Sequence, residues 1–174
     1  LLAIAGMVTA ISLLGSKYTI AVYVPKNIQL ESAFFLIVII ISSASSLVLF
    51  LIYDNAELSL YVLGAVIFGL GTAEIIAKRL YMNYSKYLLV QKVLMVVLSI
   101  TLYYWIGMNG IILGIALSYF SYMKIIIKTF KVTPIDFSLL KPRFGFLMNS
   151  YLMDIVANLG KQIGLHFEEN NVNL

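Results

Sequence analysis

Long apolar runs, separated by short polar connections, dominate the pattern of this chain. Reading for stretches with few charged residues gives six segments of roughly the 20 residues that a helix needs to cross ~30 Å of hydrocarbon. The first five are clear, whereas polar residues interrupt the sixth. The pattern therefore predicts an all-α fold, a polytopic transmembrane helix bundle, with spans at residues 1–24, 32–53, 58–77, 88–107, 109–127 and 144–165.

Prolines, glycines and charges mark the connections between these runs. The first span stops at Pro25, and Gly107–Gly110 leaves so little room that the fourth and fifth spans must form an antiparallel hairpin. The only long polar connection contains two prolines, which prevent one continuous helix. We therefore expect a five-helix bundle over 1–127, a cytoplasmic linker over 128–143, a further transmembrane helix over 144–165 and a polar tail over 166–174.

The distribution of Lys and Arg predicts which ends of the spans face the cytoplasm. Nine of the 12 basic residues lie in or beside the first, third and fifth connections, and the second and fourth connections hold none. By the positive-inside rule the three basic connections are cytoplasmic, while Asp54 and Glu57 mark the outer side. All connections agree with one alternating path, so we expect a multi-pass protein of the cytoplasmic membrane.

Composition supports this class and excludes others. The chain is 61% hydrophobic with a mean hydropathy of +0.97, and its 11% of charged residues compares with about 25% in soluble domains. Such a chain needs a lipid bilayer around it, and it leaves no basic soluble face for nucleic acid. Cysteine is absent and His166 is the only histidine, so we expect no metal site, no cofactor and no enzymatic activity.

Small residues repeat at every fourth position on two of the predicted spans. Ala65, Gly69, Ala73 and Ala77 form one such ridge, and Gly110, Gly114 and Ser118 form the other. Because lipid supplies no hydrophobic drive for helix association, close backbone approach along small residues is a common way to pack membrane helices. We expect both ridges to contact other helices.

Ionisable residues within the spans are the candidates for function. An isolated charge at a helix centre costs roughly 2.5–3.5 kcal/mol on insertion scales, so such groups usually face a partner or a water-filled cavity. The alternative for the two long lysines is to snorkel to the membrane interface. By depth alone, Glu74 could pair with Lys17 or Lys92. The residues in question are Lys17, Glu74, Lys92, Asp154 and Lys161.

The sixth span carries a polar stripe. Ser150, Asp154, Asn158 and Lys161 follow spacings of four, four and three, which place them on one helical face. This arrangement favours a wet lumen on that side of the helix, and the alternative is an amphipathic helix lying flat in the interface. Candidates for a substrate or ion pathway are therefore Lys17, Glu74, Lys92, Ser150, Asp154, Asn158 and Lys161.

Short patches along the chain carry a family resemblance. Residues 11–15 followed by 21–26 look like one membrane helix of a known family, and 107–111 looks like a later hairpin of that family. Residues 136–141 preceding Asn149-Ser150-Tyr151 look like its cytoplasmic linker into the seventh helix. These patches are similar to the polysaccharide-biosynthesis flippases of the multidrug/oligosaccharidyl-lipid/polysaccharide exporter superfamily, with this chain resembling helices two to seven.

The resemblance implies a fold and an activity. It implies a two-lobed transporter, in which this chain supplies most of the first lobe and the first helix of the second, and which flips a polyprenyl-linked oligosaccharide by alternating access. Lys17, Lys92 and Lys161 would then attract the phosphates of the carrier, and Asp154 and Glu74 would couple ions. Because the chain starts inside an apolar run without Met, we expect the parent protein to be longer.

Two alternatives stay open. One is a multidrug or small-metabolite exporter of the same superfamily. The other is a non-transporting membrane subunit of a glycan-assembly complex, whose partners would be other glycan-assembly membrane proteins. The accumulation of lipid-linked glycan in a deletion strain distinguishes the flippase from the exporter.

Overall fold

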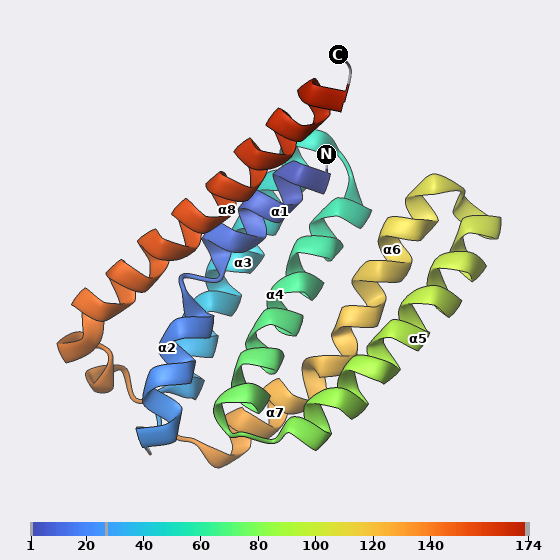
Figure 1. Cartoon of the computed structure of the whole chain (residues 1–174). Coiled ribbons are helices and arrows are strands. Elements are labelled where there is room, and N and C mark those ends of the chain that lie inside the picture. The colour runs from blue at the N-terminus through green and yellow to red at the C-terminus, as the bar shows by residue number, and fades with distance from the viewer. Residues whose placement is uncertain (1, 27, 173–174) are drawn as a thin grey trace.

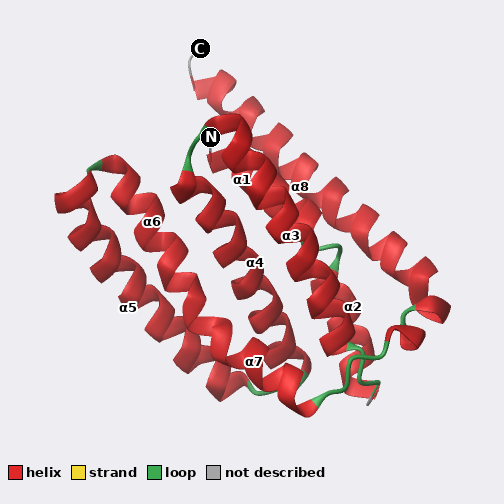
Figure 2. Cartoon of the chain, turned by 180° about the vertical axis from the view of Figure 1, so that it is seen from behind, coloured by secondary structure: helices red, strands yellow, loops and turns green. Residues whose placement is uncertain are grey.

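The fold is helical throughout the described part of the chain. The computed structural model describes the backbone of residues 2–26 and 28–172, and the side chains of residues 3–26, 28–157 and 160. Within these ranges the α-helices are α1 (Leu2–Ser12), α2 (Ser16–Tyr23), α3 (Glu31–Tyr53), α4 (Ala56–Ala77), α5 (Tyr81–Ile106), α6 (Met108–Tyr119), α7 (Met123–Val132) and α8 (Phe144–Val172) (Figures 1 and 2). No strand occurs among these residues, which confirms the predicted all-α class.

Five helices are long and apolar enough to cross a membrane. They correspond to the five clear spans of the sequence pattern, and they make this a multi-pass membrane protein by length and composition. Over its described residues α8 is not among the five, in keeping with the polar positions that interrupt it. The five segments are Ala3–Lys26, Glu31–Tyr53, Ala56–Ala77, Tyr81–Ile106 and Met108–Val132.

The path of the chain alternates between the two ends of the bundle. The connections after α2, after α4 and after α7 lie at one end, and the α3–α4 and α5–α6 turns lie at the other (Figure 1). The first of these groups contains Lys78, Arg79 and Lys141, so we call it the basic end. α4 occupies the middle of the bundle, the α5–α6 hairpin packs on one side of it, and α8 crosses over α1 and α2 on the other side (Figures 1 and 2).

The first span is broken, whereas the apolar pattern predicted one continuous helix. α1 ends at Ser12 and α2 begins at Ser16, with Leu14 at φ 49° and Gly15 at φ 66° between them. Positive φ is favourable for glycine, and it ends a helix because the following backbone turns away from the helical path. The predicted stop at Pro25 is confirmed, since this proline lies in a 3-10 turn over Val24–Lys26.

Two further boundaries differ from the prediction. α5 begins at Tyr81 instead of residue 88, because Arg79 takes a left-handed conformation with φ 56° and closes α4 sharply. The Leu80 N–H donates to the Ile75 carbonyl at 3.0 Å and the Arg79 N–H to the Ile76 carbonyl at 2.9 Å, the pattern of a Schellman motif.

The fifth span continues further than residue 127. A 3-10 turn at Phe120–Tyr122 leads into α7, whose last residues occupy the start of the segment assigned to the linker. Only residues 133–143 remain as a connection, and they form two short 3-10 turns, Phe137–Leu139 and Lys141–Arg143. Asp136 caps the first turn by accepting hydrogen bonds from the Ser138 N–H at 2.9 Å and hydroxyl at 2.6 Å, which lower the pKa of Asp136.

The small-residue ridges contact neighbouring helices, as expected. A Cβ atom at Gly114 of α6 would lie 2.5 Å from the Ser99 nitrogen of α5, and one at Gly110 would lie 2.2 Å from the Leu102 carbonyl oxygen. On α4, Gly69 makes room for the Leu13 side chain. The glycines therefore set how closely the α5–α6 hairpin and the first span can pack.

Replacing Gly114 with alanine tests the hairpin packing. Because the new methyl group would press on the α5 backbone, we expect a loss of about 1–3 kcal/mol in stability, read as a lower thermal unfolding temperature in detergent. Gly6→Ala is the matched control, because nothing lies within 4 Å of a Cβ atom at Gly6. Equal unfolding temperatures for the two variants would contradict the close approach of α5 and α6.

Candidate functional site

The break in the first span lies half-way along it. The Ser16 N–H donates to the Leu13 carbonyl at 2.8 Å, so the helix tightens there before α2 starts. Residues 13–15 sit near the centre of the segment Ala3–Lys26, at the depth where a membrane gives backbone groups no water. In membrane proteins such breaks are tolerated where they are buried in protein or line a cavity.

Buried serines surround the break. Ser12 and Ser16 flank it and are fully buried, and their hydroxyl oxygens have no hydrogen-bond partner among the described residues. Ser150 of α8 is also buried and lies directly against Gly15, where a Cβ atom would be 2.6 Å from the Ser150 carbonyl carbon. An unsatisfied buried hydroxyl costs about 1–3 kcal/mol, so these groups mark a place where a polar ligand or water would be stabilising.

Lys17 and Asp154 lie on the two helices that meet at this break. Lys17 is exposed on α2 and Asp154 is half-buried on α8, within the range over which their charges would interact. Lys17 also lines a cavity of about 300 Å³ together with Thr72 of α4 and Tyr84 of α5. The structure therefore brings together three predicted residues, Lys17, Ser150 and Asp154, beside the break.

An apolar crevice adjoins the break. It has a volume of about 250 Å³ and lies between α3, α8 and the segment before α8. The side chains that line it are all hydrophobic. The residues around it include Leu14, Phe34, Leu140, Leu147 and Tyr151. Leu14, within the break, and Tyr151, next to the buried Ser150 on α8, connect the crevice to the break.

A second polar cluster lies at the basic end, around Glu74. The Lys78 Nζ is 2.5 Å from the Glu74 Oε1 and 3.8 Å from the Glu31 Oε1, while the Thr129 hydroxyl donates to the other oxygen of Glu74. Both glutamates are about 5% exposed. The pairing of Glu74 with Lys17 or Lys92, allowed by depth, is therefore wrong, because Lys78 one helical turn away already occupies the carboxylate.

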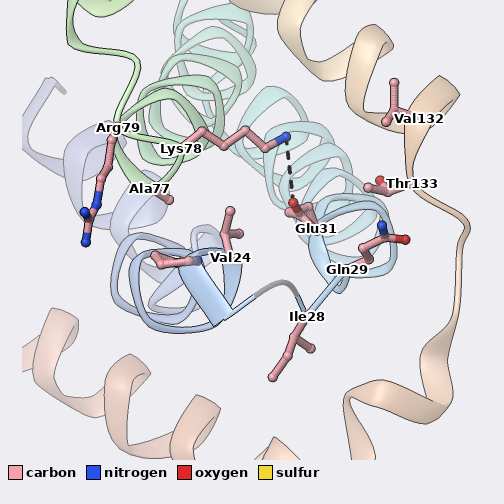
Figure 3. Close-up of a pocket in the computed structure, with 10 residues that line it drawn as sticks. Val24, Ile28, Gln29, Glu31, Ala77, Lys78, Arg79, Val132 and Thr133 are labelled. Carbon is pink, nitrogen blue, oxygen red and sulfur yellow. Dashed lines mark ion pairs between the residues drawn. The ribbon is translucent and has the colours of Figure 1, made fainter.

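Hydroxyl groups extend this acid–lysine cluster from α3 to α7. The Ser32 hydroxyl donates to the Thr133 carbonyl at 2.9 Å and approaches the Thr129 carbonyl at 3.2 Å. A cavity of about 600 Å³ opens beside the cluster, and Lys78 reaches across it toward Glu31 while Arg79 points away from that pair (Figure 3). The cluster joins α3, α4 and α7 at one end of the bundle.

The remaining predicted residues are not gathered at either cluster. Lys92 is exposed on α5 and belongs to neither of them. The side chains of Asn158 and Lys161 lie outside the described residues. Among the described residues no group of three or more His, Cys, Asp and Glu could hold a metal ion.

Sequence reasoning missed Glu31, Lys78, Thr129 and Gln91. The spacing of Glu74 and Lys78 is i, i+4, so their pairing was readable from the chain. Glu31 and Thr129 were not, because their roles depend on which helices are neighbours. Gln91 is fully buried and donates to the Ser118 hydroxyl at 3.1 Å, a link between α5 and α6 that no pattern in the sequence indicates.

Comparisons with known proteins add no relative. No family model matches the chain, and no curated protein and no solved structure matches it significantly. The family resemblance accordingly rests on the sequence patches, and the site is described from its own geometry.

Proposed function

We propose that this chain is part of a membrane transporter that flips a lipid-linked oligosaccharide by alternating access. The observation that carries the proposal is the break at the centre of the first span, against which the α8 backbone packs at Ser150 and Tyr151. In transporters, substrate and ion sites lie near the membrane midplane at discontinuous helices, whose free backbone groups and adjacent side chains contact the ligand. The family resemblance of the sequence patches points to the same activity.

The surroundings of the break suit a lipid-linked substrate. Lys17 supplies a positive charge for the phosphates of the carrier, and Asp154 lies close enough to interact with that charge. The apolar crevice between α3 and α8 suits the polyprenyl chain, because hydrophobic side chains line it. A small polar solute would use the charges and leave the crevice without a role, so the crevice favours the flippase over a small-metabolite exporter.

In this proposal the acid–lysine cluster holds one end of the bundle shut. Glu31, Glu74 and Lys78 bring α3 and α4 together, and Ser32 ties α3 to α7. Alternating access requires contacts that form at one end when the other end opens. A cluster that joins three helices at the basic end is suited to be such a contact. The resemblance and the charge distribution support a cytoplasmic location for this end.

Neutralising Lys17 tests the proposal. In proteoliposomes containing the membrane protein that carries this chain, we expect Lys17→Gln to slow flipping of a fluorescent polyprenyl-linked oligosaccharide about tenfold or more, since a charge-assisted contact with phosphate is lost. Lys92→Gln is the matched control, because it removes the same charge from the exposed side of α5. Wild-type flipping by Lys17→Gln, or equal losses in both variants, would refute a role for the break.

A further inference from the structure

A basic pocket lies at the basic end between α4, α5 and α7, away from the break in the first span. Its volume is about 180 Å³, and α8 packs on the opposite side of the molecule (Figure 1). Polar side chains from all three helices line it. They include Glu74, Lys78, Asn83, Tyr87, Lys124 and Lys128.

The charges of this pocket are unbalanced. Lys78 is held by Glu74 and Glu31, so its charge is already compensated. Lys124 and Lys128 stand one turn apart on the same face of α7, and no carboxylate among the described residues forms an ion pair with either. Like charges at this spacing destabilise a helix slightly. An anion between them would reverse that effect, and the amide of Asn83 and the hydroxyl of Tyr87 add neutral donors.

An apolar groove continues from the pocket along α5. It has a volume of about 400 Å³ and shares Tyr87 and Lys124 with the pocket. Val90 and Leu94 line it further along α5, and both are exposed in the described structure. Lys86 stands at its edge and adds a further positive charge. A basic pocket that leads into an apolar groove at the end of a membrane helix bundle is complementary to a phospholipid. The pocket matches the charged phosphate, and the groove matches an acyl chain.

We propose that this pocket binds the phosphate of an anionic phospholipid whose acyl chain lies in the groove along α5. Basic pockets between membrane helices at one face of the bilayer recognise acidic headgroups in this way. The pocket is separate from the break near α8, so the proposed ligand is a resident lipid of the membrane and not the transported substrate. The pocket shares Glu74 and Lys78 with the acid–lysine cluster. The recognised chemistry is a phosphate, which a soluble phosphate ion also offers, and the groove favours the lipid.

Lipid retention tests the proposal. We place the purified protein in nanodiscs of phosphatidylglycerol and phosphatidylcholine in equal amounts, release it into detergent, and count the retained lipids by native mass spectrometry. The wild type is expected to keep phosphatidylglycerol. Lys124→Gln/Lys128→Gln is expected to bind it about thirtyfold more weakly, because each lysine near a membrane surface contributes about fivefold to binding of anionic lipid.

The control removes the same charge elsewhere at the same end. Lys131→Gln/Lys141→Gln changes two exposed lysines that do not line the pocket, and it is expected to retain phosphatidylglycerol as the wild type does. Equal loss in both double variants would show a general effect of surface charge and would overturn the site. Displacement of the lipid by inorganic phosphate at equal concentration would also overturn it, because the groove would then contribute nothing. Each readout is independent of flipping.

Discussion

Replacing Gly15 with alanine is expected to lower the stability of the protein by about 2–4 kcal/mol, because two costs coincide at this position. Gly15 has φ 66°, a conformation that costs a non-glycine residue roughly 1–2 kcal/mol. A Cβ atom would also lie 2.6 Å and 2.7 Å from backbone atoms of Ser150 and Tyr151. Because these are backbone atoms, α8 must move away from the first span for the methyl group to fit.

Gly15→Asn separates the two costs. Asparagine tolerates the left-handed conformation better than alanine, yet it carries the same Cβ atom. Thermal unfolding in detergent is expected to show a large loss for both variants, and Gly6→Ala, which has open space around it, is expected to show none. A wild-type unfolding temperature for Gly15→Asn would mean that α8 does not press on the break, and the site beside it would lose its support.

The main spans were predictable because the length of an apolar run determines whether a helix can cross the membrane. Apolar runs long enough to cross a bilayer are read directly from the sequence, and all five that the pattern made clear are helical segments of the required length and hydropathy, the first with a break at its centre. Their exact limits were less accessible. The start of α5 at Tyr81 depends on Arg79 taking a left-handed conformation, which this residue type rarely does and which composition therefore does not indicate.

The break in the first span shows why local pattern is insufficient. Leu13, Leu14 and Gly15 lie within an apolar run, and a lone glycine there is compatible with a continuous membrane helix. What distinguishes Gly15 is its contact with the α8 backbone, more than a hundred residues later in the chain. The polar stripe of Ser150 and Asp154 was visible in the sequence, but the helix that it faces was not.

The ion pairs also show which contacts the sequence pattern predicts and which depend on the tertiary fold. Depth in the membrane predicted that Glu74 lies at the same level as Lys17 and Lys92. Its ion-pair partner is Lys78 instead, because Lys78 lies one turn away on the same helix, α4. The second acid, Glu31, is the first residue of α3 and reaches Lys78 at the end of α4 only because α3 and α4 pack side by side. Which helices are neighbours is determined by the tertiary fold, so the contact of Glu31 with Lys78 could not be predicted from sequence spacing.

Replacing Lys78 with methionine is expected to cost about 3–5 kcal/mol, because it leaves two buried carboxylates without their cation. Glu31 and Glu74 are each about 5% exposed, so water cannot compensate for the lost charge. Methionine keeps much of the length and apolar surface of the lysine stem, which limits the loss of packing. The measurement is the thermal unfolding temperature in detergent, and Lys92→Met on the exposed face of α5 is the matched control.

A double variant tests whether the ion pair itself is responsible. Glu74→Gln/Lys78→Met removes one acid together with the lysine and preserves the acceptor for the Thr129 hydroxyl, so it is expected to recover part of the stability lost in Lys78→Met. Additive losses from the two changes would mean that Glu74 and Lys78 act independently. In that case the cluster would not hold α3, α4 and α7 together through charge, and its proposed role in closing the basic end would fall.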